Sequence, residues 1–218
     1  MEKKITGWDF FSLGMIAFGG LGIEVLYAFL LEPMLYGGPM ESWTTGQNIL
    51  HWIITCLTWG LVSYLLILDS KKKYQFNLFA TADKMTKWQW VSVILCVVIA
   101  LVASYIDWKG FKIIKEFQNR GLLLFIFQYI YYAFETVLFM LIIIFAQKAF
   151  EVWFKRKNIP YGGIICGITW GLAHISTKGS LWIGLETMFL GFLLGVTYLL
   201  VNKDIKKTYI LLFIMFAL

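Results

Sequence analysis

Long runs of apolar residues alternate with short polar segments along the whole chain. The longer runs approach the roughly 20 residues that an α-helix needs to cross a lipid bilayer. Within each run the apolar residues are continuous, whereas a membrane β-strand would alternate apolar and polar residues. The pattern therefore predicts helices at residues 10–31, 49–68, 88–106, 122–147, 163–176 and 181–201, and a shorter one at 208–218.

The fold class predicted by this pattern is all-α, a polytopic transmembrane helical bundle of about seven membrane segments with a short last segment. The longest polar tract, residues 69–87, is too short to separate two folded domains, so we expect a single domain over residues 1–218. Within it, residues 1–120 would form scaffold helices and residues 121–218 the functional core. The first apolar run is too long for a cleaved signal peptide, and we expect it to stay as a membrane anchor.

The composition supports this class. Sixty per cent of the residues are apolar and only 15% are charged, whereas soluble domains carry about 25% charged residues. The three cysteines, Cys56, Cys96 and Cys166, lie inside apolar runs without the spacing of a metal site, and we expect them to be core residues. The sequence contains no nucleotide-binding or zinc-protease motif. We therefore expect no cofactor and no metal.

The basic residues indicate an orientation. With a cytoplasmic N-terminus, 14 of the 19 Lys and Arg residues lie on the cytoplasmic side and the other five lie outside, in agreement with the positive-inside rule. Four of those five belong to residues 107–120. We expect this segment to form an amphipathic helix on the membrane surface, with Phe111, Ile113, Ile114 and Phe117 on its apolar side.

These features predict a multi-pass integral protein of a bacterial plasma membrane, with the lipid bilayer as its constant partner. The net charge of +6 reflects cytoplasmic lysines that face anionic lipid headgroups. No segment combines a basic surface with a nucleic-acid-binding fold, so we expect no nucleic-acid partner. The sequence does not indicate an oligomeric state.

Two ionisable residues, Glu135 and His174, lie near the middle of predicted membrane helices. An acid at the centre of a bilayer costs about 3 kcal/mol on insertion scales, so such residues face partners or a water-filled cavity. Gln128, Tyr131, Tyr132 and Glu135 recur at spacings of three, four and seven and therefore share one helix face. The pattern predicts a polar site near the membrane midplane, with this face directed into the bundle.

The next two helices carry a packing signal of small residues. Glycines recur at every fourth position, at Gly163, Gly167 and Gly171, and again at Gly191 and Gly195. In lipid, such glycines allow helix backbones to approach closely. Because Gly167 and His174 are seven residues apart, we expect the imidazole to project from the glycine-lined face toward a neighbouring helix.

Two motifs in this region resemble those of a known family. The stretch Glu135-Thr136-Val137-Leu138-Phe139-Met140 is similar to Glu-Glu-x-x-Phe-Arg, and Trp170-Gly171-Leu172-Ala173-His174 is similar to Phe-x-x-x-His. These motifs are typical of the CPBP intramembrane proteases, which include CAAX prenyl endopeptidases and Abi-type bacteriocin self-immunity proteins. The resemblance extends from Tyr129 to the end of the chain.

The resemblance implies a CPBP-like core in the C-terminal half and an endopeptidase that acts on membrane-associated or prenylated peptides. In that case Glu135 activates a water as general base and His174 supports it as the histidine of the second motif. The supporting or cavity-lining residues would be Gln128, Tyr131, Tyr132, Thr136, Phe139, Trp170 and Gly171.

The chain also departs from the family pattern. Thr136 stands in place of the second glutamate and Met140 in place of the arginine, and residues 204–218 contain no His or Asn for a third motif. A second interpretation is therefore a non-catalytic pseudoprotease that binds a peptide or a membrane-protein partner, in an immunity or scaffold role. Proton relay in a transporter is a third interpretation, and a purely structural tie between two helices is a fourth. Whether the chain is an enzyme stays open at this point.

Three further ionisable residues lie within or at the ends of apolar runs. We expect structural roles for Glu24 and Glu186, although Glu24 has the alternative of joining the central site. His51 follows the start of a predicted helix and is next to Trp52, so we expect it at the membrane interface.

Overall fold

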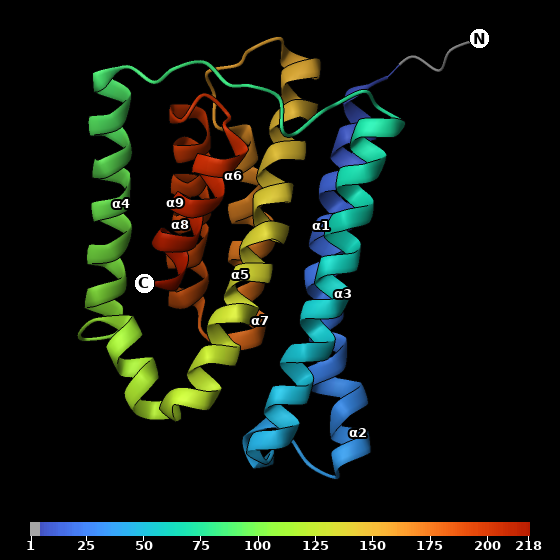
Figure 1. Cartoon of the computed structure of the whole chain (residues 1–218), viewed down its shortest axis with the longest axis vertical. Helices are drawn as coiled ribbons and strands as arrows, with labels where there is room; N and C mark the ends of the chain where they lie inside the picture. The colour runs from blue at the N-terminus through green and yellow to red at the C-terminus, as the bar shows by residue number, and fades with distance from the viewer. Residues whose placement is uncertain (1–4) are drawn as a thin grey trace.

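The computed structural model describes residues 5–218, and every regular element within them is a helix (Figure 1). Lys3 and Lys4, which contribute to the predicted orientation, lie outside this range. In chain order the elements are α1 (Gly7–Leu26), the π-helical turn η1 (Tyr27–Leu31), α2 (Glu32–Tyr36), the 3-10 turn η2 (Met40–Ser42), α3 (Thr45–Lys72), α4 (Lys87–Asp107), α5 (Lys112–Phe154), α6 (Tyr161–Cys166), the π-helical turn η3 (Gly167–Gly171), α7 (Leu172–Lys178), α8 (Leu181–Leu200) and α9 (Ile205–Ala217).

Five helical segments are long and apolar enough to cross a membrane. They are Gly7–Tyr36, Thr45–Lys72, Lys87–Asp107, Lys112–Phe154 and Leu181–Leu200. The chain is therefore a multi-pass integral membrane protein, as its hydrophobic pattern predicts. The other two predicted segments are also helical but shorter: residues 161–178 are broken by η3, and α9 has 13 residues.

Helix α5 lies at the centre of the bundle. Its residues 138–146 are all buried. Helices α1 and α3 pack on one side of α5, whereas α6 and α9 pack on the other side, and α8 lies against α6 and η3 (Figure 1). Helix α4 stands at the edge of the bundle, where it contacts α8 and α9.

Helix α5 begins ten residues earlier than its predicted start, at Lys112 rather than at residue 122. The two parts meet at Gly121, which has φ 71° and ψ 169° and therefore breaks the helix. Glycine tolerates this backbone because it has no Cβ. The amphipathic helix predicted at residues 107–120 is thus present over its second half, as the first part of α5.

Glycines form the contact between α8 and the segment formed by α6 and η3. A Cβ added at Gly195 would lie 2.2 Å from the Cα of Gly163, and one added at Gly191 would lie 2.8 Å from the Cα of Gly167. These distances are far below ordinary contact, so the two backbones touch without intervening side chains. The predicted glycine packing is confirmed, and it holds η3 at a fixed distance from α8.

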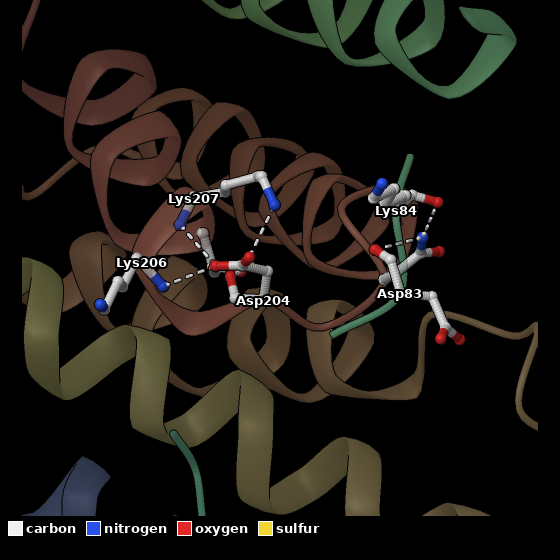
Figure 2. A network of polar contacts seen from close by, with 7 residues as sticks. Asp83, Lys84, Asp204, Lys206 and Lys207 are labelled. Atoms are coloured by element: carbon white, nitrogen blue, oxygen red, sulfur yellow. Dashed lines mark hydrogen bonds and ion pairs between the residues drawn. The ribbon is translucent and has the colours of Figure 1, made fainter. Parts of the chain in front are cut away.

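The turn between α8 and α9 is held by polar contacts, which Figure 2 shows from close by. The Oδ1 atom of Asp204 accepts hydrogen bonds from the backbone N–H groups of Lys206 and Lys207 at 3.0 Å, and Lys207 Nζ donates to Oδ2 at 2.6 Å. Asp204 is therefore the N-cap of α9, and its negative charge interacts favourably with the positive end of the helix dipole.

The same turn anchors the edge helix. Asn202 Nδ2 donates to the carbonyl oxygens of Asp83 and Lys84, at 3.2 and 3.3 Å. Gln89 Nε2 of α4 donates to Asn202 Oδ1 at 2.6 Å. The segment before α4 and the first turn of α4 are thus tied to the C-terminal helices through one amide side chain.

Replacing Asp204 by alanine should lower the free energy of unfolding by about 1 kcal/mol, the usual effect of losing an N-cap. The side chain of Lys207 and its backbone N–H hold the pKa of Asp204 below its ordinary value. This stabilisation is therefore present above the unfolded-state pKa of about 4 and is lost as the pH falls through the lowered pKa. Unfolding by detergent titration or by heat between pH 3 and 7 measures the loss of stability and its pH dependence. Asp204→Asn, which still caps but does not titrate, should lack this pH dependence.

Candidate functional site

An open-sided cavity of about 1410 Å³ lies between the helices and is lined by residues from α1 to α5, α7, α8 and α9 and from the turns η1, η2 and η3. This exceeds the roughly 300–1,000 Å³ of ordinary ligand pockets. Its lining contains the acidic residues Glu24, Glu41, Asp107, Glu135 and Glu186, and the basic residues Lys112, Arg120 and Lys178. The predicted pair, Glu135 and His174, is part of the lining. The two residues of the predicted polar site therefore line the same cavity.

Glu135 enters the cavity from the middle of α5, and its residue is 8% exposed. Its Oε1 atom accepts a hydrogen bond from Trp170 Nε1 at 2.9 Å. Trp170 belongs to the π turn η3, and its ring packs against Phe139 at 4.8 Å and Phe216 at 5.5 Å between centroids. The indole is thus held from two sides, and it orients one oxygen of the carboxylate.

His174 reaches the cavity from α7, one turn beyond Trp170. Its Nδ1 atom lies 2.8 Å from the carbonyl oxygen of Trp170, and the two rings meet edge to face at 5.0 Å. A carbonyl oxygen only accepts hydrogen bonds, so Nδ1 carries the proton. In the neutral ring the lone pair is then on Nε2, which is free to act as an acceptor or base.

Trp170 contacts both predicted catalytic residues. Its indole N–H holds Glu135 and its backbone oxygen holds His174, while no hydrogen bond joins Glu135 to His174 directly within residues 5–218. The π turn explains this arrangement. It contains more residues per turn than an α-helix, so Gly167 and His174 no longer lie on one line: the glycines face α8, and His174 lines the cavity beside Glu135.

Replacing Trp170 by phenylalanine should destabilise the protein by about 1–2 kcal/mol, because a buried carboxylate loses its donor while an aromatic ring is retained. Unfolding of the purified protein in lipid, followed by circular dichroism, measures the change. Trp88→Phe is a suitable control, since Trp88 is exposed on the outside of α4. An equal loss of stability in both variants would show that the indole N–H is not stabilising Glu135.

Gln128 and Tyr132 line the cavity, but they bind a different carboxylate. Gln128 Nε2 and the Tyr132 hydroxyl donate to Glu116 Oε1, at 2.9 and 2.6 Å, and Gln128 Nε2 also lies 2.7 Å from the Tyr132 hydroxyl. Lys112 Nζ lies over the Tyr132 ring at 4.6 Å and donates to the Phe216 carbonyl at 2.8 Å. Sequence analysis missed Lys112 and Glu116 as members of the site, although their spacing of four residues puts them on one helix face.

The first part of α5 explains this second cluster. Its Lys112 and Glu116 are buried, whereas Ile113, Ile114 and Phe117 are exposed on the outside. The predicted apolar side chains are therefore exposed on the outside, whereas Lys112 and Glu116 turn into the protein and Lys115, Gln118 and Asn119 stay exposed. The break at Gly121 makes this possible, because it allows the first part of α5 to change direction relative to the rest.

The other predicted site residues take different positions. Tyr131 lines the cavity and packs against Trp59, with ring centroids 4.8 Å apart. Phe139 supports Trp170 from behind, and Gly171 lies against the backbone of Met188, so both support the site without lining the cavity.

Thr136 does not take part in the site. It is fully buried, and its hydroxyl donates to the Tyr132 carbonyl of its own helix at 2.7 Å. Its face of α5 points into the packed core rather than toward the cavity. The residue in the position of the family's second glutamate therefore contributes no polar group to the hollow.

His51 lies near the start of α3 and is buried within the protein. It is 1% exposed, and its Nδ1 atom lies 2.6 Å from Glu32 Oε2. Its Nε2 atom lies 3.7 Å from Glu24 Oε1. Glu24 and His51 both line the cavity, which bears out the alternative placement of Glu24 in the central site. The sequence contains no signal for the Glu32 contact, because η1 and the turn before α3 create it.

Comparison of the chain with protein-family models, with curated proteins and with solved structures finds no match. The likeness to CPBP proteases therefore depends on the two motifs around Glu135 and His174. Within residues 5–218, no group of three or more His, Cys, Asp and Glu side chains is arranged to hold a metal ion.

Proposed function

We propose that this chain is a CPBP-like intramembrane peptidase that hydrolyses a membrane-associated or lipidated peptide in the central cavity. One observation carries the proposal: Glu135 and His174 line the same cavity and are joined through Trp170. The proposal includes seven membrane segments, of which α9 is the short last one, a cytoplasmic N-terminus, and a functional core in residues 121–218.

In this mechanism Glu135 takes a proton from a water molecule, which then attacks the peptide carbonyl carbon. Trp170 binds Oε1, and no described residue is hydrogen-bonded to Oε2, so that oxygen is left for the water. The resulting tetrahedral oxyanion needs a donor. His174 Nε2 would supply one after taking a proton from solvent, because in the neutral ring this atom holds the lone pair. When the C–N bond breaks, the proton held by Glu135 passes to the leaving amine, and the carboxylate is regenerated.

The shape of the cavity supports an apolar substrate with a peptide attached. Its volume exceeds that of a small-molecule pocket. Its walls include aromatic rings, among them Trp59, Tyr131, Trp170 and Phe216. An apolar chain would lie against these rings, while the polar group of a peptide bond would reach Glu135.

A second candidate is a non-catalytic protein that binds the same kind of peptide. Thr136 is engaged with its own helix, Met140 is buried in the core, and α9 presents Met215 and Phe216 to the cavity instead of His or Asn. Removing a single oxyanion donor from an enzyme costs about 10²–10³ in rate. The absence of the third motif from residues 204–218 therefore favours binding without chemistry.

Cleavage in ¹⁸O-labelled water separates the two candidates. The protein, purified in lipid nanodiscs, is incubated with prenylated and bacteriocin-like peptides, and the products are analysed by mass spectrometry. A peptidase yields fragments with one ¹⁸O atom in the new carboxylate. Saturable peptide binding without labelled fragments would favour the second candidate. If the peptides are neither bound nor cleaved, both candidates are contradicted.

A further inference from the structure

A groove of about 370 Å³ lies on the outside of the bundle between α3 and α5, and the proposed reaction does not use it. Trp52, Cys56 and Gly60 recur at every fourth position of α3 and therefore form one row along the groove. The row passes from a large side chain to a small one and then to none. A Cβ at Gly60 would lie 3.0 Å from the ring of Phe134, so the groove depends on the absence of side-chain atoms there.

The rim of the groove faces lipid. Its most exposed residues are Ile53, Leu57 and Leu61 of α3 and Ile130 of α5, which are 40–69% exposed. Both helices are long and apolar enough to cross a membrane, and no charged residue lines the groove. Only an apolar chain from the bilayer or an apolar helix of another molecule therefore suits this groove.

The length of the groove matches one leaflet. From Trp52 to Leu61 the α3 helix rises by about 14 Å, whereas half of the hydrocarbon core of a bilayer is about 15 Å thick. The groove starts near the end of α3 that follows residue 45, and α5 lines it with Phe127, Ile130 and Phe134. An acyl chain of the leaflet next to the turn between α4 and α5 would therefore run along it.

Arg120 marks the end of the groove where a headgroup would lie. Its guanidinium is 5.5 Å from the centre of the Trp52 ring, and Trp52 is the first residue of the groove. The side chain is exposed, and within residues 5–218 it has no carboxylate oxygen within 4 Å and no hydrogen bond. A guanidinium presents five donors that match the oxygens of a phosphate, and the contact with Trp52 leaves them free.

The charge around Arg120 favours an anionic headgroup over a zwitterionic one. Residues 107–120 contain four basic and two acidic side chains, so this segment has a net charge of +2. Lys115 is exposed on the same part of α5. Basic residues near the membrane surface attract anionic lipids. An apolar helix of another molecule would fill the groove but would leave the Arg120 guanidinium without an anion.

We propose that the groove between α3 and α5 binds one acyl chain of an anionic phospholipid, whose phosphate accepts hydrogen bonds from the Arg120 guanidinium. Trp52 positions the guanidinium, and Cys56 and Gly60 leave room for the chain. The site does not depend on the proposed hydrolysis, because Glu135 and His174 are not part of it.

Native mass spectrometry of the full chain in detergent, titrated with phosphatidylglycerol or phosphatidylcholine, tests the headgroup contact. The first phosphatidylglycerol should bind at least about tenfold more tightly than phosphatidylcholine, the effect of one charge-assisted contact. Arg120→Gln should reduce this difference to within about twofold, and the fold should be kept because the side chain is exposed. Lys115→Gln is the matched control and should keep the tenfold difference, since Lys115 lines neither the groove nor the cavity.

A second pair of variants tests the groove itself. Ile130→Trp places an indole in the groove and should weaken binding of phosphatidylglycerol at least about fivefold. Ile126→Trp is the control, because Ile126 is equally exposed, at 45%, and does not line the groove. Equal binding of the two lipids by the parent, an unchanged preference in Arg120→Gln, or full affinity in Ile130→Trp would overturn the proposal. A dimer that Ile130→Trp dissociates would also overturn it, since a second copy of the chain would then fill the groove.

Discussion

The Glu135→Gln variant should lose peptide cleavage by about 100-fold or more, while its melting temperature stays close to that of the parent protein. General-base catalysis contributes about 10²–10⁴ in rate, and an amide does not take a proton from water. The structure predicts that folding is spared, because Trp170 Nε1 can donate to the amide oxygen of glutamine as it does to Glu135 Oε1. Initial cleavage rates of a prenylated peptide in nanodiscs, recorded with melting curves, measure both quantities.

Glu186→Gln is the control for this prediction, since it also replaces a carboxylate of the same cavity by an amide. It should retain full activity. Cleavage by Glu135→Gln at the parent rate would remove Glu135 from the reaction. A lower melting temperature of this variant, combined with no turnover in either protein, would make Glu135 a structural tie between α5 and η3.

Replacing Gly195 by leucine should destabilise the protein by about 3 kcal/mol or more, and the folded form should be recovered in low yield. Inserting side-chain volume into packed regions typically costs 1–3 kcal/mol when neighbours can adjust. Here the first added atom meets the Cα and N atoms of Gly163, at 2.2 and 2.4 Å, and backbone atoms have no alternative rotamer. The helices must separate, and the separation would also displace η3.

Gly19→Leu is the matched control, because nothing lies within 4 Å of a Cβ at that position on α1. Both variants add the same side chain to an apolar helix. Unfolding by SDS titration, followed by tryptophan fluorescence, compares them with the parent. Equal stability of the two variants would mean that α6 and α8 do not touch through their glycines.

The helices of this protein follow directly from its sequence, because a run of about 20 apolar residues has few alternatives in a membrane. The joint location of Glu135 and His174 also follows, since each is costly in hydrocarbon and needs a polar environment. Their spacing did not reveal Trp170 as the link between them. That role depends on η3. A π turn has hydrogen bonds between residues five apart rather than four apart, and no single residue in the sequence specifies this difference.

Two other groups of contacts could not be derived from the sequence for a different reason. Glu32 and His51 meet because the chain reverses between α2 and α3, and the contact is formed by residues 19 positions apart. Lys112 and Glu116 turn inward because Gly121 breaks α5. Both results depend on the direction of the chain after a turn, whereas hydrophobic patterns report only which segments are helical.

The π turn gives the site an unusual dependence on chain length. Deleting Ile168 or Thr169 from the π turn would let this segment close as a regular α-helix. The residues before the deletion would be rotated by about 100° relative to those after it. The glycines at 163 and 167 could then no longer face α8 while Trp170 and His174 face the cavity, although the apolar length of the segment would hardly change. An ordinary hydropathy profile would not detect this loss. In an alignment of homologous chains, a one-residue gap between the second helix-packing glycine and the tryptophan would therefore separate proteins that keep this site from proteins that keep only the fold.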